Sequence, residues 1–164
     1  MACRGVHFAI EPWEAERLSS AVNDEGCLSI IKDEIEQRWD QEWCYETDKA
    51  WDAIHRCLTD GQLSFENGEY PLRACILGGR ALYSGADYIC LLVTPEQAGE
   101  IGRALATIGE QEFRQRYEKI NRKGYSRELD EQDFGYTWEY FSGLSDFFQR
   151  ANSCNRFVVF TVDQ

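Results

Sequence analysis

The sequence predicts a single α+β domain over residues 1–164, with several helices packed on a small mixed sheet that contains the N- and C-terminal strands. Three observations support this fold class. The stretches "RGVHFAI" (4–10) and "RFVVFTV" (156–162) are rich in strand-forming residues and lie near the two ends of the chain. Helical patterns fill much of the sequence between them. The length of 164 residues and hydrophobic fraction of 43% suit one domain with a substantial core.

The N-terminal half shows three helical patterns. Pro12 suits the first turn of a helix, and the acids around it suit the positive end of the helix dipole. The stretch 27–39 has an apolar stripe at helical spacing, made of Ile31, Ile35 and Trp39. A third helix is predicted over 48–59, with Thr47 as its N-cap and Gly61 as its terminator.

The C-terminal half predicts one more strand and three further helices. Residues 62–87 are irregular, and "YICLLV" (88–93) is typical of a buried strand. The helix in 94–109 has strong end signals, with Thr94 as cap, Pro95 in the first position and Gln97 completing a capping box. Two other helices are predicted over 110–120 and 133–151.

The cysteines and the apolar runs indicate a reducing compartment. The chain has seven cysteines, and no two of them have the C-x-x-C spacing. This odd count argues against a disulfide framework, and the spacing argues against a zinc ribbon. No secretory leader is apparent, and no apolar run approaches the ~20 residues that span a bilayer. We therefore expect a cytoplasmic protein without a metal or another cofactor.

The formal charge of −12 is unevenly distributed. Residues 1–70 carry 16 acidic and 6 basic side chains, whereas residues 71–127 carry 6 acidic and 9 basic ones. The acidic field disfavours nucleic acid and anionic membrane as partners. The basic run within 114–127 is diluted by acids and is interpreted as a solvated helix face. The acidic N-terminal half is either a solubilising surface or a face that meets a basic protein partner.

Two blocks carry a family resemblance. "DKAWDAIHRCLTDG" (48–61) and "LGGRALYSGADYICLLVTPEQAGEIGRAL" (77–105), followed by a final aromatic helix and strand, resemble the YfbM-like family of small bacterial proteins. The resemblance spans roughly residues 1–162. It implies a single α+β domain in the bacterial cytoplasm, and it carries no established reaction to these residues.

The first block holds His55, one of two histidines in the chain. On a helical wheel, Trp51 lies on the apolar face, and a polar stripe of Asp48, Asp52 and His55 runs along its edge. An acid three residues before a histidine can hold one tautomer and raise its basicity, as a general base requires. His55 and Asp52 are therefore the catalytic candidates, while Asp48 and Trp51 are candidate contacts for a ligand or partner. The alternative is a packed helix in which Asp52 pairs with Arg56.

The second block has two glycines followed by Arg80, Tyr83 and Asp87. These residues could form a backbone-lined pocket in which Arg80 grips an anion. Alternatively, the glycines only permit the turn that leads into the strand at 88.

Two functional hypotheses follow. The first is a non-enzymatic protein-binding module of the immunity type, whose acidic face engages a basic partner. The alternative is a small enzyme or ligand-binding domain with a pocket between helix 48–59 and loop 78–87. In that pocket His55 would act as acid and base, Asp52 would orient it, and Arg80 would bind an anion.

Overall fold

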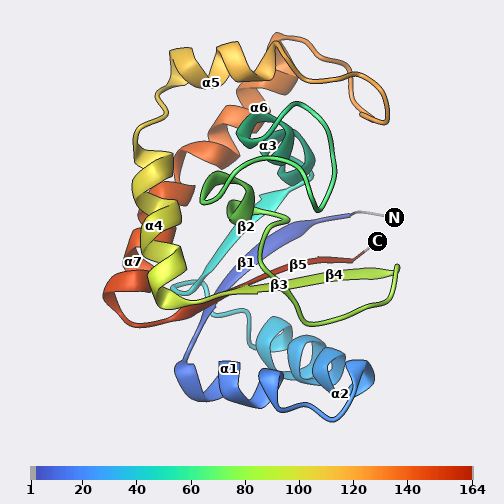
Figure 1. The fold of residues 1–164 in the computed structure, drawn as a ribbon, viewed down its shortest axis with the longest axis vertical. Coiled ribbons are helices and arrows are strands. Elements are labelled where there is room, and N and C mark those ends of the chain that lie inside the picture. The colour runs from blue at the N-terminus through green and yellow to red at the C-terminus, as the bar shows by residue number, and fades with distance from the viewer. Residues whose placement is uncertain (1–2, 164) are drawn as a thin grey trace.

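The computed structural model describes residues 3–163, which form a five-stranded sheet covered by helices on both faces (Figure 1). The order of the strands across the sheet is β2-β1-β5-β4-β3. The expected N- and C-terminal strands are neighbours at its centre, where Gly5 pairs with Val162 and Ile10 pairs with Phe157. The strands are β1 (Gly5–Ile10), β2 (Cys44–Asp48), β3 (Arg80–Ala81), β4 (Tyr88–Val93) and β5 (Phe157–Asp163).

All pairings between these five strands are antiparallel, so the expected mixed sheet is corrected to an antiparallel one. Alternation of apolar residues predicts a strand and its buried faces, but it contains no information on the direction of the neighbouring strand. That direction depends on how the connecting helices return the chain to the sheet.

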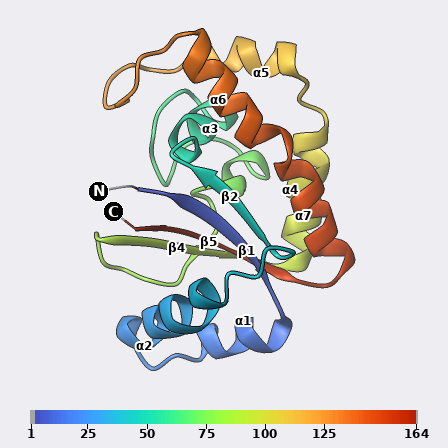
Figure 2. The ribbon, with the colours of Figure 1, turned by 180° about the vertical axis from the view of Figure 1, so that it is seen from behind.

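The helices form two layers of unequal size (Figure 2). The smaller layer covers one face of the sheet and is continuous in sequence; it consists of α1 (Pro12–Ser19), α2 (Asp24–Ser29) and the π-helix η1 (Ile30–Glu36). The larger layer covers the other face and comprises α3 (Trp51–Leu58), the 3₁₀ helix η2 (Leu72–Cys75), α4 (Pro95–Ala106), α5 (Glu110–Tyr117), α6 (Glu131–Ser142) and α7 (Leu144–Ser153).

The sheet separates two hydrophobic clusters. Because successive side chains of a strand point to opposite faces, Phe8 and Ile10 of β1 join the cluster beneath the smaller layer, while Ala9 joins the cluster beneath the larger one. The whole of β4 is buried for the same reason, which confirms the buried strand expected over 88–93. Two-sided burial fixes the strand register, since a shift by one residue would exchange the two faces.

The third helix begins later than the sequence predicts. Residues 44–48 form strand β2, and α3 starts only at Trp51. The expected N-cap Thr47 belongs to this strand, and its hydroxyl donates to the carbonyl of Gly5 at 3.0 Å. Asp48 then turns the chain with a φ of 42°, a left-handed conformation that aspartate tolerates better than most residues.

Two other predicted helices differ in detail from the expectation. The stretch 27–39 is helical without a break up to residue 38, because α2 continues directly into the π-helix η1, but Trp39 is 37% exposed instead of extending the buried stripe of Ile31 and Ile35. The stretch 133–151 is interrupted between α6 and α7 at Gly143, where a Cβ atom would lie 2.5 Å from the Tyr45 hydroxyl oxygen. Contact with β2, which is distant in sequence, therefore makes glycine necessary at this junction.

The helix α4 has the predicted start. The side chains of Thr94 and Gln97 form the reciprocal capping box, with Pro95 in the first turn. Its face towards α7 contains Gly99 and Gly102, which allow close approach to Asn152 and Gln149. None of the helices within residues 3–163 has the length and apolar character that crossing a membrane requires.

Candidate functional site

The catalytic candidate His55 is enclosed by protein and is only 1% exposed. Its Nε2 atom lies 2.9 Å from both the Ser64 carbonyl oxygen and the Asn67 Oδ1 atom. Both partners are acceptors, so Nε2 carries the proton and donates to them. Burial lowers the pKa of His55, which keeps the imidazole neutral. This histidine holds the loop that follows α3.

The amide of Asn67 organises the same loop. Its Nδ2 atom donates to Thr59 Oγ1 at 3.1 Å, to Asp60 Oδ1 at 2.5 Å and to the Gln62 carbonyl at 2.9 Å. These donor contacts assign the amide orientation and leave Oδ1 to accept from His55. Residues 59–67 are thereby tied to the C-terminal end of α3.

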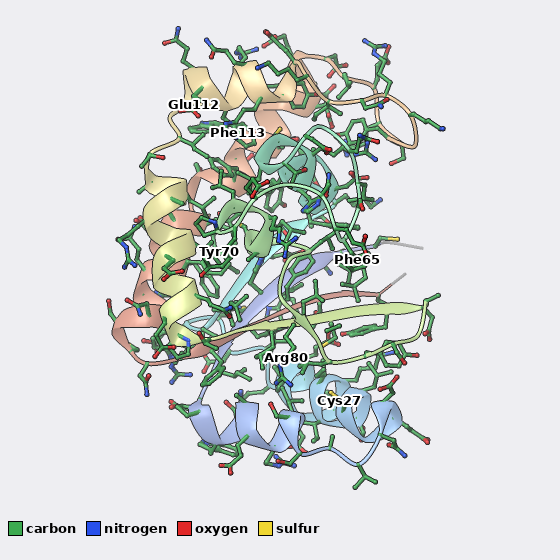
Figure 3. The ribbon with its side chains drawn as sticks, in the orientation of Figure 1. Cys27, Phe65, Tyr70, Arg80, Glu112 and Phe113 are labelled. Atoms are coloured by element: carbon green, nitrogen blue, oxygen red, sulfur yellow. The ribbon has the colours of Figure 1, made fainter. Side chains whose placement is uncertain are left out.

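The candidate Arg80 lies on the opposite side of the sheet from α3. Its guanidinium donates from Nη2 to the hydroxyl of Ser19, the last residue of α1, at 2.6 Å. Figure 3 shows Arg80 directed towards the smaller helical layer. Nearby, the hydroxyl of Tyr83 donates to Asp87 at 2.6 Å, which lowers the pKa of this carboxyl. The structure thus brings Tyr83 and Asp87 together and separates Arg80 from His55.

Two other candidates of the first block, Trp51 and Asp52, line a cavity of about 320 Å³. It lies where the start of α3 meets residues 121–130, which are named loop 121–130 here and connect α5 with α6. Lys49, Trp51 and Asp52 line the cavity from the α3 side, Tyr125 and Arg127 line it from loop 121–130, and Leu63 lines it from the loop after α3. Its volume is at the lower end of the ~300–1,000 Å³ range of ligand pockets.

The buried side chain of Arg56 fixes loop 121–130 against α3. Its Nε atom donates to Asp52 Oδ1 at 2.5 Å, as the i to i+4 pairing predicts. Its other nitrogens donate to the carbonyls of Asn121 at 3.0 Å and Gly124 at 3.3 Å. The guanidinium carbon also lies 5.4 Å from the ring centroid of Tyr125. The wall of the cavity is therefore held by one arginine, a stabilising arrangement because all its partners are acceptors or an aromatic face.

A second anchor is the carboxylate of Asp133 in α6, which is 3% exposed. The hydroxyls of Tyr117 and Tyr125 both donate to its Oδ2 atom at 2.6 Å, and Arg127 pairs with its Oδ1 atom. The carboxylate and burial together raise the pKa values of both tyrosines, which keeps them protonated as donors. Loop 121–130 is thus attached to α6 as well as to α3, and the cavity is preformed.

Asp48 lies next to this cavity, outside its lining. Its carboxylate accepts from the Tyr136 hydroxyl at 2.6 Å, and that hydroxyl is also 3.2 Å from the backbone nitrogen of Lys49. Arg127 packs over the Tyr136 ring at 4.4 Å from the centroid. Asp48 therefore connects the β2–α3 junction to α6.

The second notable feature is the smaller helical layer with the residues that follow it, and residues 11–42 are named the acidic layer. It carries ten carboxylates against three basic residues, which corresponds to a formal charge of −7. Not all of its acids face outwards, since Glu14 is buried and Glu36 bonds to Tyr88 and Thr161 of the sheet. Two of the three bases are paired within it, in Arg17–Glu34 and Arg38–Glu14. Three large apolar side chains are exposed on the same layer, Trp13 by 55%, Val22 by 99% and Trp39 by 37%.

Local ion pairs compensate half of the basic run within 114–127. Arg114 pairs with Glu131, Arg116 pairs with Glu112, and Arg127 pairs with Asp133. Lys119, Arg122 and Lys123 are exposed, and the structure of residues 3–163 gives them no ion pair.

Residues 3–163 contain no group of three or more His, Cys, Asp or Glu side chains arranged to hold a metal ion. The seven cysteines are unpaired. Burial raises the pKa values of Cys57, Cys75 and Cys90 above that of a free thiol, which disfavours a reactive thiolate.

Sequence reasoning missed most of the cavity. Tyr125, Arg127 and Asp133 are more than 60 residues from α3 along the chain, and helical periodicity relates only residues within one helix. One signal could have identified part of it. Asp133 is the one charged residue on the buried side of α6, beside Phe134, Thr137 and Phe141, and a buried carboxylate requires partners.

The family comparison agrees with this fold. Residues 1–161 match the profile of a family described as a domain of unknown function, DUF1877, and the chain therefore belongs to that family. Among solved structures, the chain is similar to YfbM from Escherichia coli, described as a protein of unknown function. The two share 17% identity with a TM-score of 0.71, covering 97% of this chain and 99% of YfbM. No curated protein sequence matches the chain. The YfbM-like resemblance and the α+β fold are thereby confirmed.

Proposed function

We propose that this protein is a non-enzymatic binding module whose acidic layer engages a basic protein partner, as an immunity protein engages its toxin. The observation that carries the proposal is the coincidence of a −7 charge with exposed Trp13 and Val22 on one helical layer. Tryptophan is a frequent anchor of protein interfaces, and a surrounding field of one sign accelerates the encounter with a partner of the other sign. We further propose that binding takes place in the cytoplasm, where unpaired cysteines remain reduced.

The test is affinity capture from native cytosol at low and high salt, with matched variants. Trp13→Ala and the pair Glu16→Lys/Glu25→Lys alter exposed positions of the acidic layer. Both are expected to reduce capture of a basic protein at least tenfold, and high salt is expected to weaken capture by the wild type.

The control pair Glu110→Lys/Glu128→Lys makes the same charge change at exposed positions outside the acidic layer, and it is expected to retain capture. An empty capture at low salt, or equal loss in both pairs, would contradict the proposal. Circular dichroism confirms that each variant is folded.

A second candidate function is a ligand-binding domain or small enzyme. The expected pocket between helix 48–59 and loop 78–87 loses support, because Arg80 contacts α1 and His55 is enclosed by the loop after α3. The cavity beside Lys49, Trp51 and Asp52 favours ligand binding at a different place. The observation that favours ligand binding is that hydrogen bonds already hold the walls of this cavity in place.

A further inference from the structure

The cavity beside α3 carries charged groups of both signs in addition to an apolar wall. Asp52 contributes a carboxylate whose Oδ1 atom accepts from Arg56, while its Oδ2 atom is accessible to solvent and has no hydrogen bond within residues 3–163. Because Arg56 is itself fixed by loop carbonyls, the carboxylate has a defined position. A bound cation could therefore pair with Oδ2 without disturbing the existing contact.

The cationic groups of the cavity come from Lys49 and Arg127. Lys49 is exposed, and within the part of the chain that the structure describes its ammonium group makes no ion pair. Arg127 uses Nε for Asp133 and stacks on Tyr136, so its terminal nitrogens stay available as donors. Together they offer several donors to an anionic group.

The apolar wall is formed by Trp51, Tyr125 and Leu63. The polar ends of the two aromatic residues are already satisfied, since Trp51 Nε1 donates to the Cys3 carbonyl at 3.0 Å and the Tyr125 hydroxyl donates to Asp133. Trp51 is only 5% exposed and packs on Phe160, so it offers a small edge of its ring, and the rest of the apolar wall comes from Tyr125 and from Leu63, which is 38% exposed. Leu63 is part of the loop that His55 and Asn67 hold in place.

We infer that this cavity binds an apolar α-amino acid as a zwitterion, with its ammonium on Asp52, its carboxylate on Lys49 and Arg127, and its side chain against Trp51, Tyr125 and Leu63. The inference rests on the second candidate function, ligand binding beside α3. Asp52 and Arg127 are each already paired through one atom, with Arg56 and Asp133, so the free positions are Asp52 Oδ2, the Lys49 ammonium and the terminal nitrogens of Arg127. A simple anion would use only the cationic positions, and a simple amine would use only Oδ2, whereas a zwitterion uses both. The volume of about 320 Å³ suits one small ligand.

Calorimetric titration with four related compounds tests the inference. L-Phenylalanine carries both charges, 3-phenylpropanoate lacks the ammonium, phenethylamine lacks the carboxylate, and benzyl alcohol lacks both. We expect L-phenylalanine to bind at least tenfold more tightly than each of the other three, because only it satisfies both sets of groups.

Two variants assign the binding to this cavity. Lys49→Met removes one cation at an exposed position, and Asp52→Asn removes the charge while its amide oxygen can still accept from Arg56. Each is expected to weaken L-phenylalanine binding at least fivefold. Lys123→Met is the matched control, since Lys123 is exposed and lies outside the cavity, and it is expected to bind as the wild type does.

The outcomes separate this inference from the function on which it rests. If 3-phenylpropanoate or phenethylamine binds as tightly as L-phenylalanine and Lys49→Met or Asp52→Asn weakens that binding, the zwitterion inference is overturned and ligand binding is retained. If none of the four compounds binds, both fail. Equal binding of L-phenylalanine by the wild type, Lys49→Met and Asp52→Asn would also overturn the assignment to this cavity.

Discussion

Arg56 and Asp52 form an ion pair one helical turn apart in α3, with 2.5 Å between Nε and Oδ1, and the arginine side chain is only 3% exposed. The same guanidinium donates to loop carbonyls more than 60 residues away. A single side chain therefore links the local geometry of one helix to the position of loop 121–130. Arg56 is therefore one of two buried charges, with Asp133, that hold loop 121–130 at the cavity.

Replacing this arginine is expected to destabilise the protein strongly. Arg56→Met leaves Asp52 without its partner and three loop carbonyls without a donor, so the free energy of unfolding is expected to fall by about 3 kcal/mol. Urea denaturation measures the loss, and hydrogen exchange is expected to increase in loop 121–130.

The matched control is Arg116→Met, which removes another i to i+4 pair, with Glu112, at a more exposed place. Its cost is expected to stay below about 1 kcal/mol. Similar losses in the two variants would contradict the anchoring role of Arg56.

The buried histidine of β1 predicts acid sensitivity. His7 is enclosed by aromatic rings, and burial lowers its pKa to about 4, whereas the unfolded chain titrates near 6.5. The unfolded state therefore binds more protons between these values, and stability falls as the pH decreases from about 6.5 towards about 4. At about pH 4, protonation of His7 is expected to lower the free energy of unfolding by roughly 3 kcal/mol relative to pH 7.

Chemical denaturation at pH 7.0 and pH 5.0 tests this prediction. His7→Gln retains a donor for the Cys75 carbonyl and removes the titration, so its stability is expected to change less between the two pH values. His55→Gln serves for comparison, because burial lowers the pKa of His55 in the same direction. An unchanged pH dependence in His7→Gln would refute the assignment.

The contact between His55 and Asn67 is expected to behave as a coupled pair. His55→Phe fills a similar space and removes the donor to Ser64 and Asn67, with an expected cost of about 1–3 kcal/mol. In a double-mutant cycle with Asn67→Ala, the two costs are expected to be less than additive, because each variant already breaks the shared contact. Strict additivity would show that the two side chains act independently.

Substitution of alanine for glycine is expected to destabilise the protein at a close helix contact and to stabilise it at an open position. In Gly102→Ala the new Cβ would lie 2.7 Å from Gln149 Cγ and 3.0 Å from its backbone nitrogen, so the helices must separate, at a cost of about 1–3 kcal/mol. Gly135 in α6 has nothing within 4 Å of its added Cβ. Gly135→Ala is therefore expected to stabilise by roughly 0.5–1 kcal/mol. Thermal unfolding of both variants measures the contrast.

Local patterns predicted the elements whose residues interact with their own neighbours. The capping box of Thr94 and Gln97, the buried strand 88–93 and the pair Asp52–Arg56 all depend on groups at most a few residues apart. The predictions of helix ends were wrong where a residue contacts a segment that is distant in sequence. Thr47 pairs with Gly5 instead of capping α3, and the glycine between α6 and α7, Gly143, is needed because Tyr45 lies against it.

The candidate site divides in the same way. The sequence by itself determined that Trp51 is apolar-facing, that Asp52 stands beside His55, and that the N-terminal half is acidic, because these properties follow from helical spacing and composition. Only the tertiary structure decided that His55 is closed off, that Arg80 faces the smaller helical layer, and that Lys49, Asp52 and Arg127 share a cavity. The physical reason is that the burial of a side chain depends on which segments, distant in sequence, pack over it. The same packing decides which side chains meet in one cavity. At the cavity, Arg56 holds loop 121–130 through hydrogen bonds to residues 65 or more positions away, and Asp133 holds the same loop through nearer contacts with Tyr125 and Arg127.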